Sequence, residues 1–240
     1  MRMFWCSGLM ALLTGLLAGP ASAGLCQAPF MHDGGQVQLS GSGGLQLGAD
    51  LSFSEVSQQG AHNCDARVQG TATYGLAGLP PGKSTLDYRM KIRNGKASFE
   101  RPGAGGKSEP TEGRFDLRMI GLFSYGEPVT RSGQTFPELR FQINLDKKQV
   151  QTQPIVVQTG VKTVGERQTI KTAAGDQSCW PIRYTRHTEA TQASFSGLVL
   201  PIPAMTSSVT DWFCPDLNMV MRQESTQSGV ASVVEVTKIQ

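Results

Sequence analysis

Apolar and polar residues alternate with a period of two along most of this chain. Between residues 85 and 93 every second side chain is apolar: Leu86, Tyr88, Met90 and Ile92. The segments 114–119 and 139–146 show the same alternation. This period is typical of β-strands that bury one face and leave the other in water.

Turn signals separate the alternating segments. Asn94 and Gly95 stand between residues 85–93 and the short run 96–100, a pair that favours a type I′ hairpin. The other strands that the pattern predicts are 36–40, 45–53, 67–74, 155–171, 180–189, 192–198, 210–213, 219–224 and 231–238. Gly and Pro are concentrated in 101–113, which we expect to be a long mobile loop, and two prolines predict a second loop over 201–205.

About a dozen short strands and almost no helical periodicity predict an all-β fold. An antiparallel meander of this kind forms a barrel, a half-barrel or a sandwich, with few or no helices. The 28 Gly and 13 Pro of the 240 residues fit the many turns that such a meander needs. We expect one β-rich domain over residues 24–240.

The first 23 residues have the three parts of a secretory signal peptide. Arg2 gives a positive start, residues 9–18 are apolar, and the small residues 21–23 (Ala-Ser-Ala) form a cleavage site. The apolar run is about half of the ~20 residues that a membrane-spanning helix needs. Cys26 follows the cleavage site closely, but Leu25 directly before it does not fit a lipidation motif. The mature chain is therefore predicted to be periplasmic, or secreted, and without a membrane span.

Export predicts a disulfide framework, since four of the five cysteines remain after cleavage and an even number of thiols can pair. Four thiols allow three pairings, and the spacing favours Cys26 with Cys64 and Cys179 with Cys214. Each loop would stabilise the fold by roughly 3 to 4 kcal/mol in the loop-closure model. His62, Cys64 and Asp65 could alternatively hold a metal ion, but no C-x-x-C pair or second nearby His completes such a site, so we expect none.

Charge and catalytic motifs exclude several function classes. The 22 basic and 19 acidic residues nearly balance and form no basic block, so nucleic acid is not an expected partner. His32, His62 and His187 are the only histidines that could serve as a base, and neither a G-x-S-x-G nor an H-E-x-x-H motif is present. We expect a protein that is not an enzyme, with no catalytic residue and no cofactor.

The C-terminal third carries the most distinctive motifs. Residues 164–182 read as a strand, a small-residue turn at Gly175 and a second strand, and residues 209–221 contain Trp-Phe-Cys-Pro followed by Asn218. From residue 164 to 238 the chain resembles bacterial exported proteins of unknown function of the DUF3108 type, and more distantly the LolA/LolB-like half-barrels. Asn218 stands where that pattern has Gly. LolA-like carriers hold helices inside a half-barrel; because this sequence predicts none, a more closed barrel is expected.

Bulky apolar residues surround the last two cysteines, and they have two interpretations. The residues are Trp180, Trp212, Phe213, Met219 and Met221. They form either ordinary core or the lining of an apolar cavity, as the resemblance to lipid carriers implies. The sequence thus predicts a periplasmic protein that binds a lipid, an acyl chain or a lipoprotein in a β-barrel cavity. The alternative is an envelope assembly protein that docks a protein partner through its sheet.

Overall fold

The structure is a computed structural model of the whole chain. It describes residues 25–76, 82–94, 96–102, 108–110, 125, 127–143, 150–153, 155–195 and 198–240. The predicted signal peptide (1–23) and the predicted strand at 114–119 lie outside the described residues.

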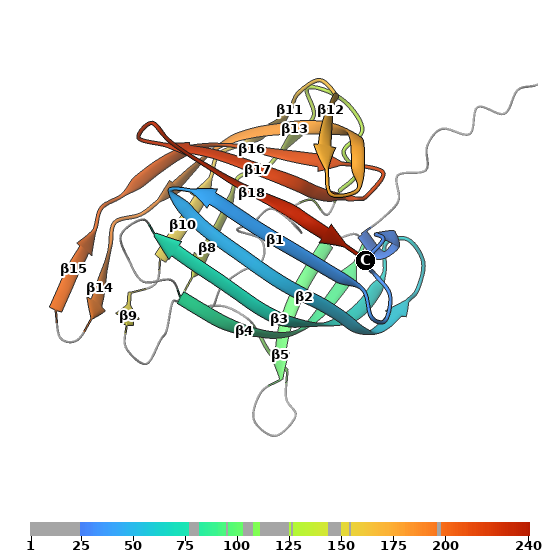
Figure 1. Cartoon of the computed structure of the whole chain (residues 1–240), viewed down its shortest axis with the longest axis horizontal. Coiled ribbons are helices and arrows are strands. Elements are labelled where there is room, and N and C mark those ends of the chain that lie inside the picture. Colours follow the sequence, from blue (N-terminus) through green and yellow to red (C-terminus); the bar gives the residue numbers. More distant parts are fainter. Residues whose placement is uncertain are drawn as a thin grey trace, which may run out of the picture.

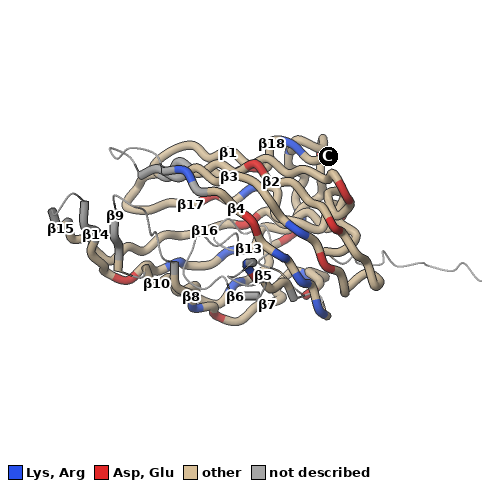
Figure 2. Tube along the Cα trace, turned by 90° about the horizontal axis from the view of Figure 1, so that it is seen from below, with Lys and Arg blue, Asp and Glu red and all other residues tan. Residues whose placement is uncertain are grey.

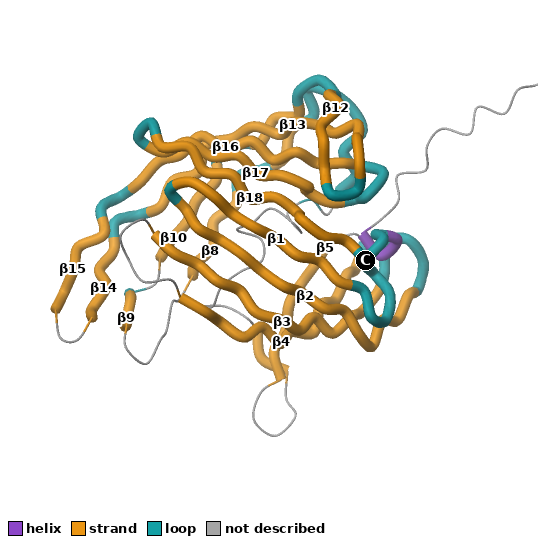
Figure 3. Tube along the Cα trace, viewed as in Figure 1, coloured by secondary structure: helices purple, strands orange, loops and turns teal. Residues whose placement is uncertain are grey.

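The described chain is almost entirely β-strand (Figure 3). In chain order the elements are the 3-10 helix η1 (Leu25–Gln27) and the strands β1 (Gln36–Gly43), β2 (Leu45–Gln58), β3 (Cys64–Leu76), β4 (Gly82–Arg93), β5 (Lys96–Pro102), β6 (Ser108–Pro110), β7 (Thr135–Phe136), β8 (Leu139–Ile143), β9 (Val150–Thr152), β10 (Ile155–Thr159), β11 (Lys162–Val164), β12 (Gln168–Thr172), β13 (Gly175–Thr188), β14 (Thr191–Phe195), β15 (Leu198–Ile202), β16 (Met205–Cys214), β17 (Met219–Gln227) and β18 (Val230–Ile239). The predicted all-β fold class is confirmed.

One 15-stranded antiparallel sheet forms the body of the molecule (Figure 1). Its strand order is β6-β5-β4-β3-β2-β1-β18-β17-β16-β13-β10-β8, with β11 and β12 paired to β13 and β7 paired to β11. The sheet curves so that β5, β8 and β10 lie behind the front strands. Among the described strands the two ends of this path, β6 and β8, do not pair, so the expected closed barrel is wrong and the half-barrel alternative describes the fold.

The first and last strands of the chain meet at the centre of this sheet. In β1, Val37 pairs with Ile239 of β18, and Gly43 pairs with Ser232. The first meander, β1–β6, and the second meander, in which β16–β18 continue into β13, β10 and β8 with β11 and β12 beside β13, are thereby joined into one hydrogen-bonded surface. The two faces of the joined sheet are set by the period-two alternation of each strand.

A second, three-stranded sheet has the order β15-β14-β9 and projects from one end of the body (Figure 1). The chain continues into it from β13 and returns from it into β16. Residues 201 and 202 lie in β15 and Met205 begins β16, so the predicted loop over 201–205 is reduced to a two-residue connection. Pro201 is tolerated because β15 is an edge strand, where one side of the backbone needs no partner.

The predicted strand at 155–171 is wrong in its continuity. The structure divides it into β10, β11 and β12, with breaks that contain Gly160 and Gly165. At these breaks the backbone still bonds to the long strand β13, through Gly160 N to Thr185 O and Gly165 N to Pro181 O. A Cβ on Gly165 would come within 2.6 Å of the Arg183 side chain. The chain therefore stays hydrogen-bonded to β13 across both breaks.

Two other turn predictions can be compared with the structure. Arg93 pairs with Lys96 and Asn94 has φ 51°, which confirms the hairpin between β4 and β5. The loop expected over 101–113 is wrong in part, because Arg101 and Pro102 belong to β5 and residues 108–110 in its middle form β6. The remainder of that segment lies outside the described residues.

Two clusters of buried apolar residues stabilise the sheet. The larger one combines the N-terminal segment and the inner positions of β1–β4 with Met219, Met221, Val234 and Val236. The smaller one is formed by Val129, Phe136, Val164, Trp180, Ile182, Phe213 and Val220. We call the face that carries Ile182 on β13 and Val234 on β18 the inner face of the sheet.

Candidate functional site

Both predicted disulfides are present. Cys26 bonds to Cys64 and Cys179 bonds to Cys214, at sequence separations of 38 and 35 residues. All four cysteines are fully buried. The second bond joins two neighbouring strands, β13 and β16, whereas the first fastens the segment that precedes β1 to the start of β3.

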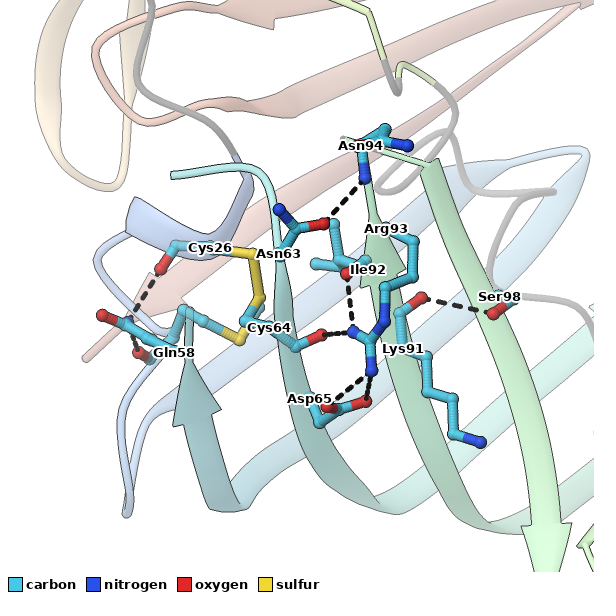
Figure 4. Close-up of a disulfide and its surroundings, with 11 residues drawn as sticks. Cys26, Gln58, Asn63, Cys64, Asp65, Lys91, Ile92, Arg93, Asn94 and Ser98 are labelled. Carbon is cyan, nitrogen blue, oxygen red and sulfur yellow. Dashed lines mark hydrogen bonds and ion pairs between the residues drawn. A yellow bond between two sulfur atoms is a disulfide. The ribbon is translucent and has the colours of Figure 1, made fainter. Parts of the chain in front are cut away.

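The side chains around the first disulfide form hydrogen bonds to the backbone (Figure 4). Gln58 Nε2 donates to the carbonyls of Cys26, at 2.8 Å, and Met31, at 3.0 Å. Arg93 Nη1 donates to the carbonyl of Cys64 at 3.1 Å. The Gln58 bonds satisfy carbonyls of the irregular N-terminal segment, and the Arg93 bond satisfies a carbonyl at the start of β3. The thiolate that a metal site at this position would need is consumed by the disulfide, and no metal-binding group of His, Cys, Asp and Glu occurs among the described residues.

The five residues predicted to line a cavity divide between the two apolar clusters. Met219 and Met221 are 1% exposed and belong to the larger apolar cluster, against which Trp212 packs from a partly buried position. Trp180 and Phe213 belong to the smaller cluster. The Arg167 guanidinium covers the Trp180 ring at 4.8 Å. The structure therefore brings these residues together in two groups, each packed among core side chains.

A buried polar cluster that sequence reasoning missed lies on the inner face of the second meander. It consists of Tyr125, Lys162, Tyr184, Arg186, Asp211 and Gln223. Asp211 is fully buried, and Lys162 and Gln223 are each 4% exposed. Burying charged groups in a protein interior is costly unless they are paired and hydrogen-bonded, so their contacts need an explanation.

Strand register brings most of this cluster together. Ile182, Tyr184 and Arg186 are alternate residues of β13 and therefore share its inner face. Across the pairing with β16, Ile182 faces Asp211, and Asp211 in turn faces Gln223 of β17. Lys162 begins β11 and pairs with Phe136, while its side chain reaches the Tyr184 ring. Four neighbouring strands thus place polar side chains at one point of the inner face.

Asp211 is the acceptor at the centre of the cluster. The Tyr125 hydroxyl donates to Oδ2 at 2.7 Å, and Gln223 Nε2 donates to Oδ1 at 2.8 Å. Both carboxylate oxygens are therefore satisfied by neutral donors. Arg186 Nη1 donates to Gln223 Oε1 at 3.4 Å, which fixes the orientation of that amide.

The Lys162 ammonium lies between two aromatic rings. Its Nζ is 4.7 Å from the centroid of the Tyr125 ring and 4.6 Å from that of Tyr184, a cation–π arrangement. Burial lowers the pKa of Lys162, and the negative charge of Asp211 opposes that shift. Burial also raises the pKa of Tyr125 and of Tyr184 well above the usual value, with Asp211 adding to it. Both phenols therefore stay protonated and remain hydrogen-bond donors.

One sequence signal could have revealed Asp211. It lies two residues after Val209 and two before Phe213, so it occupies an inward position of a strand whose other inward neighbours are buried. A charged residue at such a position is unusual in a β-sheet core. Tyr125 and Lys162 gave no comparable signal, because their partners are distant in sequence.

Basic and acidic residues lie on neighbouring strands of the first meander (Figure 2), and several of them form ion pairs on its outer face. Arg67 contacts Glu55 at 3.3 Å and Asp87 at 3.0 Å, and Arg89 contacts Glu55 at 2.8 Å. These side chains are between 37% and 53% exposed, so they are solvated pairs. His187 is also exposed and bonds to Thr206 Oγ1 at 3.0 Å, away from the buried cluster.

Comparison with known proteins gives a likeness of fold. No protein-family model and no curated protein matches this chain. A "putative lipoprotein" from Parabacteroides distasonis is similar in structure, with a TM-score of 0.51 and 14% identity over 89% of this chain and 98% of that one. A "putative exported protein with YmcC-like fold" from Bacteroides fragilis has a TM-score of 0.45 and 10% identity over 87% and 96% of the two chains. At this level of identity the first similarity concerns the fold alone, and the resemblance to DUF3108 and LolA/LolB proteins stays a prediction.

The disulfides give the compartment. Two buried disulfides in a chain of this size require an oxidising environment, so the protein is extracytoplasmic. The described part of the chain contains no helix with the length and hydrophobicity that crossing a bilayer requires.

Proposed function

We propose that this protein is a periplasmic, non-enzymatic binding protein that takes an apolar ligand, such as the acyl chain of a lipid or lipoprotein, on the inner face of its half-barrel. The observation that carries the proposal is the buried polar cluster around Asp211 and Lys162, next to the apolar inner-face residues Trp180, Ile182 and Phe213. Ligand sites are typically apolar surfaces with a few convergent polar groups, and buried ionisable groups are enriched in them.

The periplasmic part of the proposal rests on the predicted signal peptide together with the disulfides. If residues 1–23 are removed on export, the mature protein begins at Gly24. N-terminal sequencing of protein from the periplasmic fraction tests this directly. A mature chain that still begins at Met1 contradicts it.

Ligand binding can be tested with a neutral apolar fluorophore, N-phenyl-1-naphthylamine, and by native mass spectrometry of protein taken from the periplasm. We expect saturable binding of the fluorophore, or a co-purifying lipid. If neither is observed, the ligand proposal is wrong.

Two neighbouring serines provide a matched control for the binding face. Ser207 is 6% exposed and lies on the inner face of β16 beside Arg186, whereas Ser208 is exposed on the outer face. Ser207→Trp should weaken binding of the fluorophore, because the added ring occupies the inner face. Ser208→Trp should leave it unchanged, with circular dichroism confirming that both variants fold. Equal loss in both variants would place binding elsewhere.

A second candidate function is docking of a protein partner by strand addition to β15. No charged residue occurs between Glu189 and Asp211, and β15 is an edge strand of the projecting sheet. Val199 in this strand is 56% exposed. Soluble proteins usually protect such edges with charges, and an unprotected edge can pair with another chain.

The matched substitutions for this second function are Val199→Lys and Val230→Lys. Val230 is 54% exposed but lies at the start of β18 in the main sheet, whereas β15 belongs to the separate three-stranded sheet. A stoichiometric partner recovered from envelope extract should be lost with Val199→Lys and retained with Val230→Lys. Recovery of no stoichiometric partner by the unchanged protein counts against docking.

A further inference from the structure

The inner face of the second meander holds more positive than negative charge. Across β10, β11, β13, β16, β17 and β18, the inward positions of the main sheet carry two cations, Lys162 and Arg186, and one carboxylate, Asp211. Neither cation belongs to an ion pair formed among the described residues. Lys162 faces the two tyrosine rings, and Arg186 donates to the neutral Gln223.

Asp211 does not form an ion pair with either of these cations. Its two carboxylate oxygens already accept hydrogen bonds from Tyr125 and Gln223. A guanidinium carries five N–H donors in a planar fork, and Arg186 uses one of them on Gln223 in a long bond of 3.4 Å. Arg186 therefore retains donors that match the geometry of a carboxylate or phosphate.

Two buried hydroxyls flank Arg186 in the same row of the sheet. Strand register pairs Arg186 with Thr159 on β10 and with Ser207 on β16, and these residues are 4% and 6% exposed. Thr159 Oγ1 accepts a hydrogen bond from the Leu139 amide at 3.1 Å, which leaves its O–H as a donor. The row thus presents a cation between two hydroxyl groups.

We propose that Arg186, flanked by Thr159 and Ser207 and supported by Lys162, receives the anionic group of an amphipathic ligand, a carboxylate or a phosphate, whose acyl chain lies along the apolar inner face. This inference rests on the proposed function and adds to it the chemical class of the ligand's polar end.

The test compares two ligands with the same chain length, one with an anionic head group and one with a neutral head group. Dodecanoate and dodecanol are titrated against the full mature protein by displacement of N-phenyl-1-naphthylamine. We expect dodecanoate to bind about tenfold or more tightly than dodecanol, since hydrogen bonds to a charged group contribute about 1.5 to 3 kcal/mol. Equal affinity of the two ligands overturns the inference and leaves the proposed function standing. If dodecanoate, dodecanol and the fluorophore all fail to bind, the inference and the proposed function are both wrong.

Variants locate the effect. Arg186→Gln should abolish the preference for dodecanoate while dodecanol affinity stays within about twofold. The control is Arg183→Gln, because Arg183 lies on the same strand but is exposed on the outer face. If Arg183→Gln abolishes the preference equally, the effect is general surface charge and the inference is wrong. Lys162→Met is the second variant, and thermal melting shows whether each protein is folded.

Inorganic phosphate and acetate separate a lipid headgroup from a free anion. As competitors of dodecanoate they should be weaker by at least about tenfold, because they lack the chain that the apolar face would bind. Phosphate that binds as tightly as dodecanoate overturns the amphiphile and indicates a free-anion site. The comparison depends on Arg186, which is half-buried, so it remains informative even if Lys162→Met does not fold.

Discussion

At the scale of single residues, the polar cluster depends on one strong acceptor. The Tyr125 hydroxyl reaches Asp211 at 2.7 Å, whereas the Tyr184 hydroxyl receives a long contact of 3.5 Å from Gln223. A short hydrogen bond to a buried carboxylate contributes about 1.5 to 3 kcal/mol, more than a long neutral contact. The two tyrosines should therefore differ in their contribution to the free energy of unfolding.

We predict that Tyr125→Phe lowers the free energy of unfolding by about 1.5 to 3 kcal/mol, and Tyr184→Phe by less than about 1 kcal/mol. Urea denaturation of the two variants measures both values. Each change keeps the ring beside Lys162, so the comparison isolates the hydroxyl. Equal losses, or a larger loss for Tyr184→Phe, would contradict the expected difference between the two hydroxyls.

A second residue-scale prediction concerns acid stability on the outer face. Two hydrogen bonds from the Arg67 guanidinium, at 3.1 and 3.0 Å, lower the pKa of Asp87 below its usual value of 3.8. Because the folded-state pKa is depressed, the stabilisation is present above pH 3.8 and is lost as the pH falls through the lower folded value. The pair is more than a third exposed, so its contribution is reduced by solvent screening.

Asp87→Asn should accordingly cost about 0.5 to 1 kcal/mol at neutral pH, and the difference from the unchanged protein should close below pH 3.8. Denaturation at a series of pH values measures this. Asp50→Asn is the control, because Asp50 is exposed on β2 and forms no ion pair with a described residue. A difference that persists unchanged in acid contradicts the linkage.

At the scale of elements, the strands of the first meander approach closely at a glycine. Gly70 lies in the middle of β3, between Leu51 of β2 and Leu86 of β4. A Cβ at this position would overlap the backbone oxygen of Asp50. The alternation of β3 does not explain this glycine, and the close approach does.

We predict that Gly70→Ala lowers the free energy of unfolding by about 2 kcal/mol, since the strands would have to separate. Gly48→Ala on β2 is the matched control. There the added Cβ would meet the end of the Thr73 side chain at 2.8 Å, which can rotate away. Thermal melting of both variants shows which one is less stable. A Gly70→Ala protein as stable as Gly48→Ala would contradict the close approach of the strands.

Some turns and strand breaks could be predicted from the sequence, and others could not. The β4–β5 hairpin could be predicted because the Asn94-Gly95 pair is a turn signal in the sequence itself, and Asn94 has the positive φ that such a turn needs. Asn218 could likewise be assigned a glycine-like role, and it has φ 51° in the turn before β17. The division of 155–171 into three strands could not be predicted, because the bends at Gly160 and Gly165 are set by contacts with β13, which follows later in the chain.

At the scale of the whole molecule, the disulfides should contribute much of the stability. Loops of 38 and 35 residues each correspond to about 3 to 4 kcal/mol in the loop-closure model. We predict that reduction markedly lowers the melting temperature, and that replacing Cys179 and Cys214 by Ala destabilises the oxidised protein by about that amount. Thiol titration of the denatured, unreduced mature protein should find no free thiol; two or more free thiols would refute the pairing.

The amino-acid sequence by itself determined the local features of this protein. Alternation gave each strand its buried face, turn residues ended the strands, and cysteine spacing favoured the two disulfides that the structure contains. These are properties of neighbouring residues, or of the number of residues between two thiols. Only the tertiary structure decided that β1 pairs with β18, that the sheet stays an open half-barrel, and that Tyr125, Lys162, Tyr184 and Asp211 meet. Their register depends on strands far apart in sequence, and local patterns carry no information on such pairings.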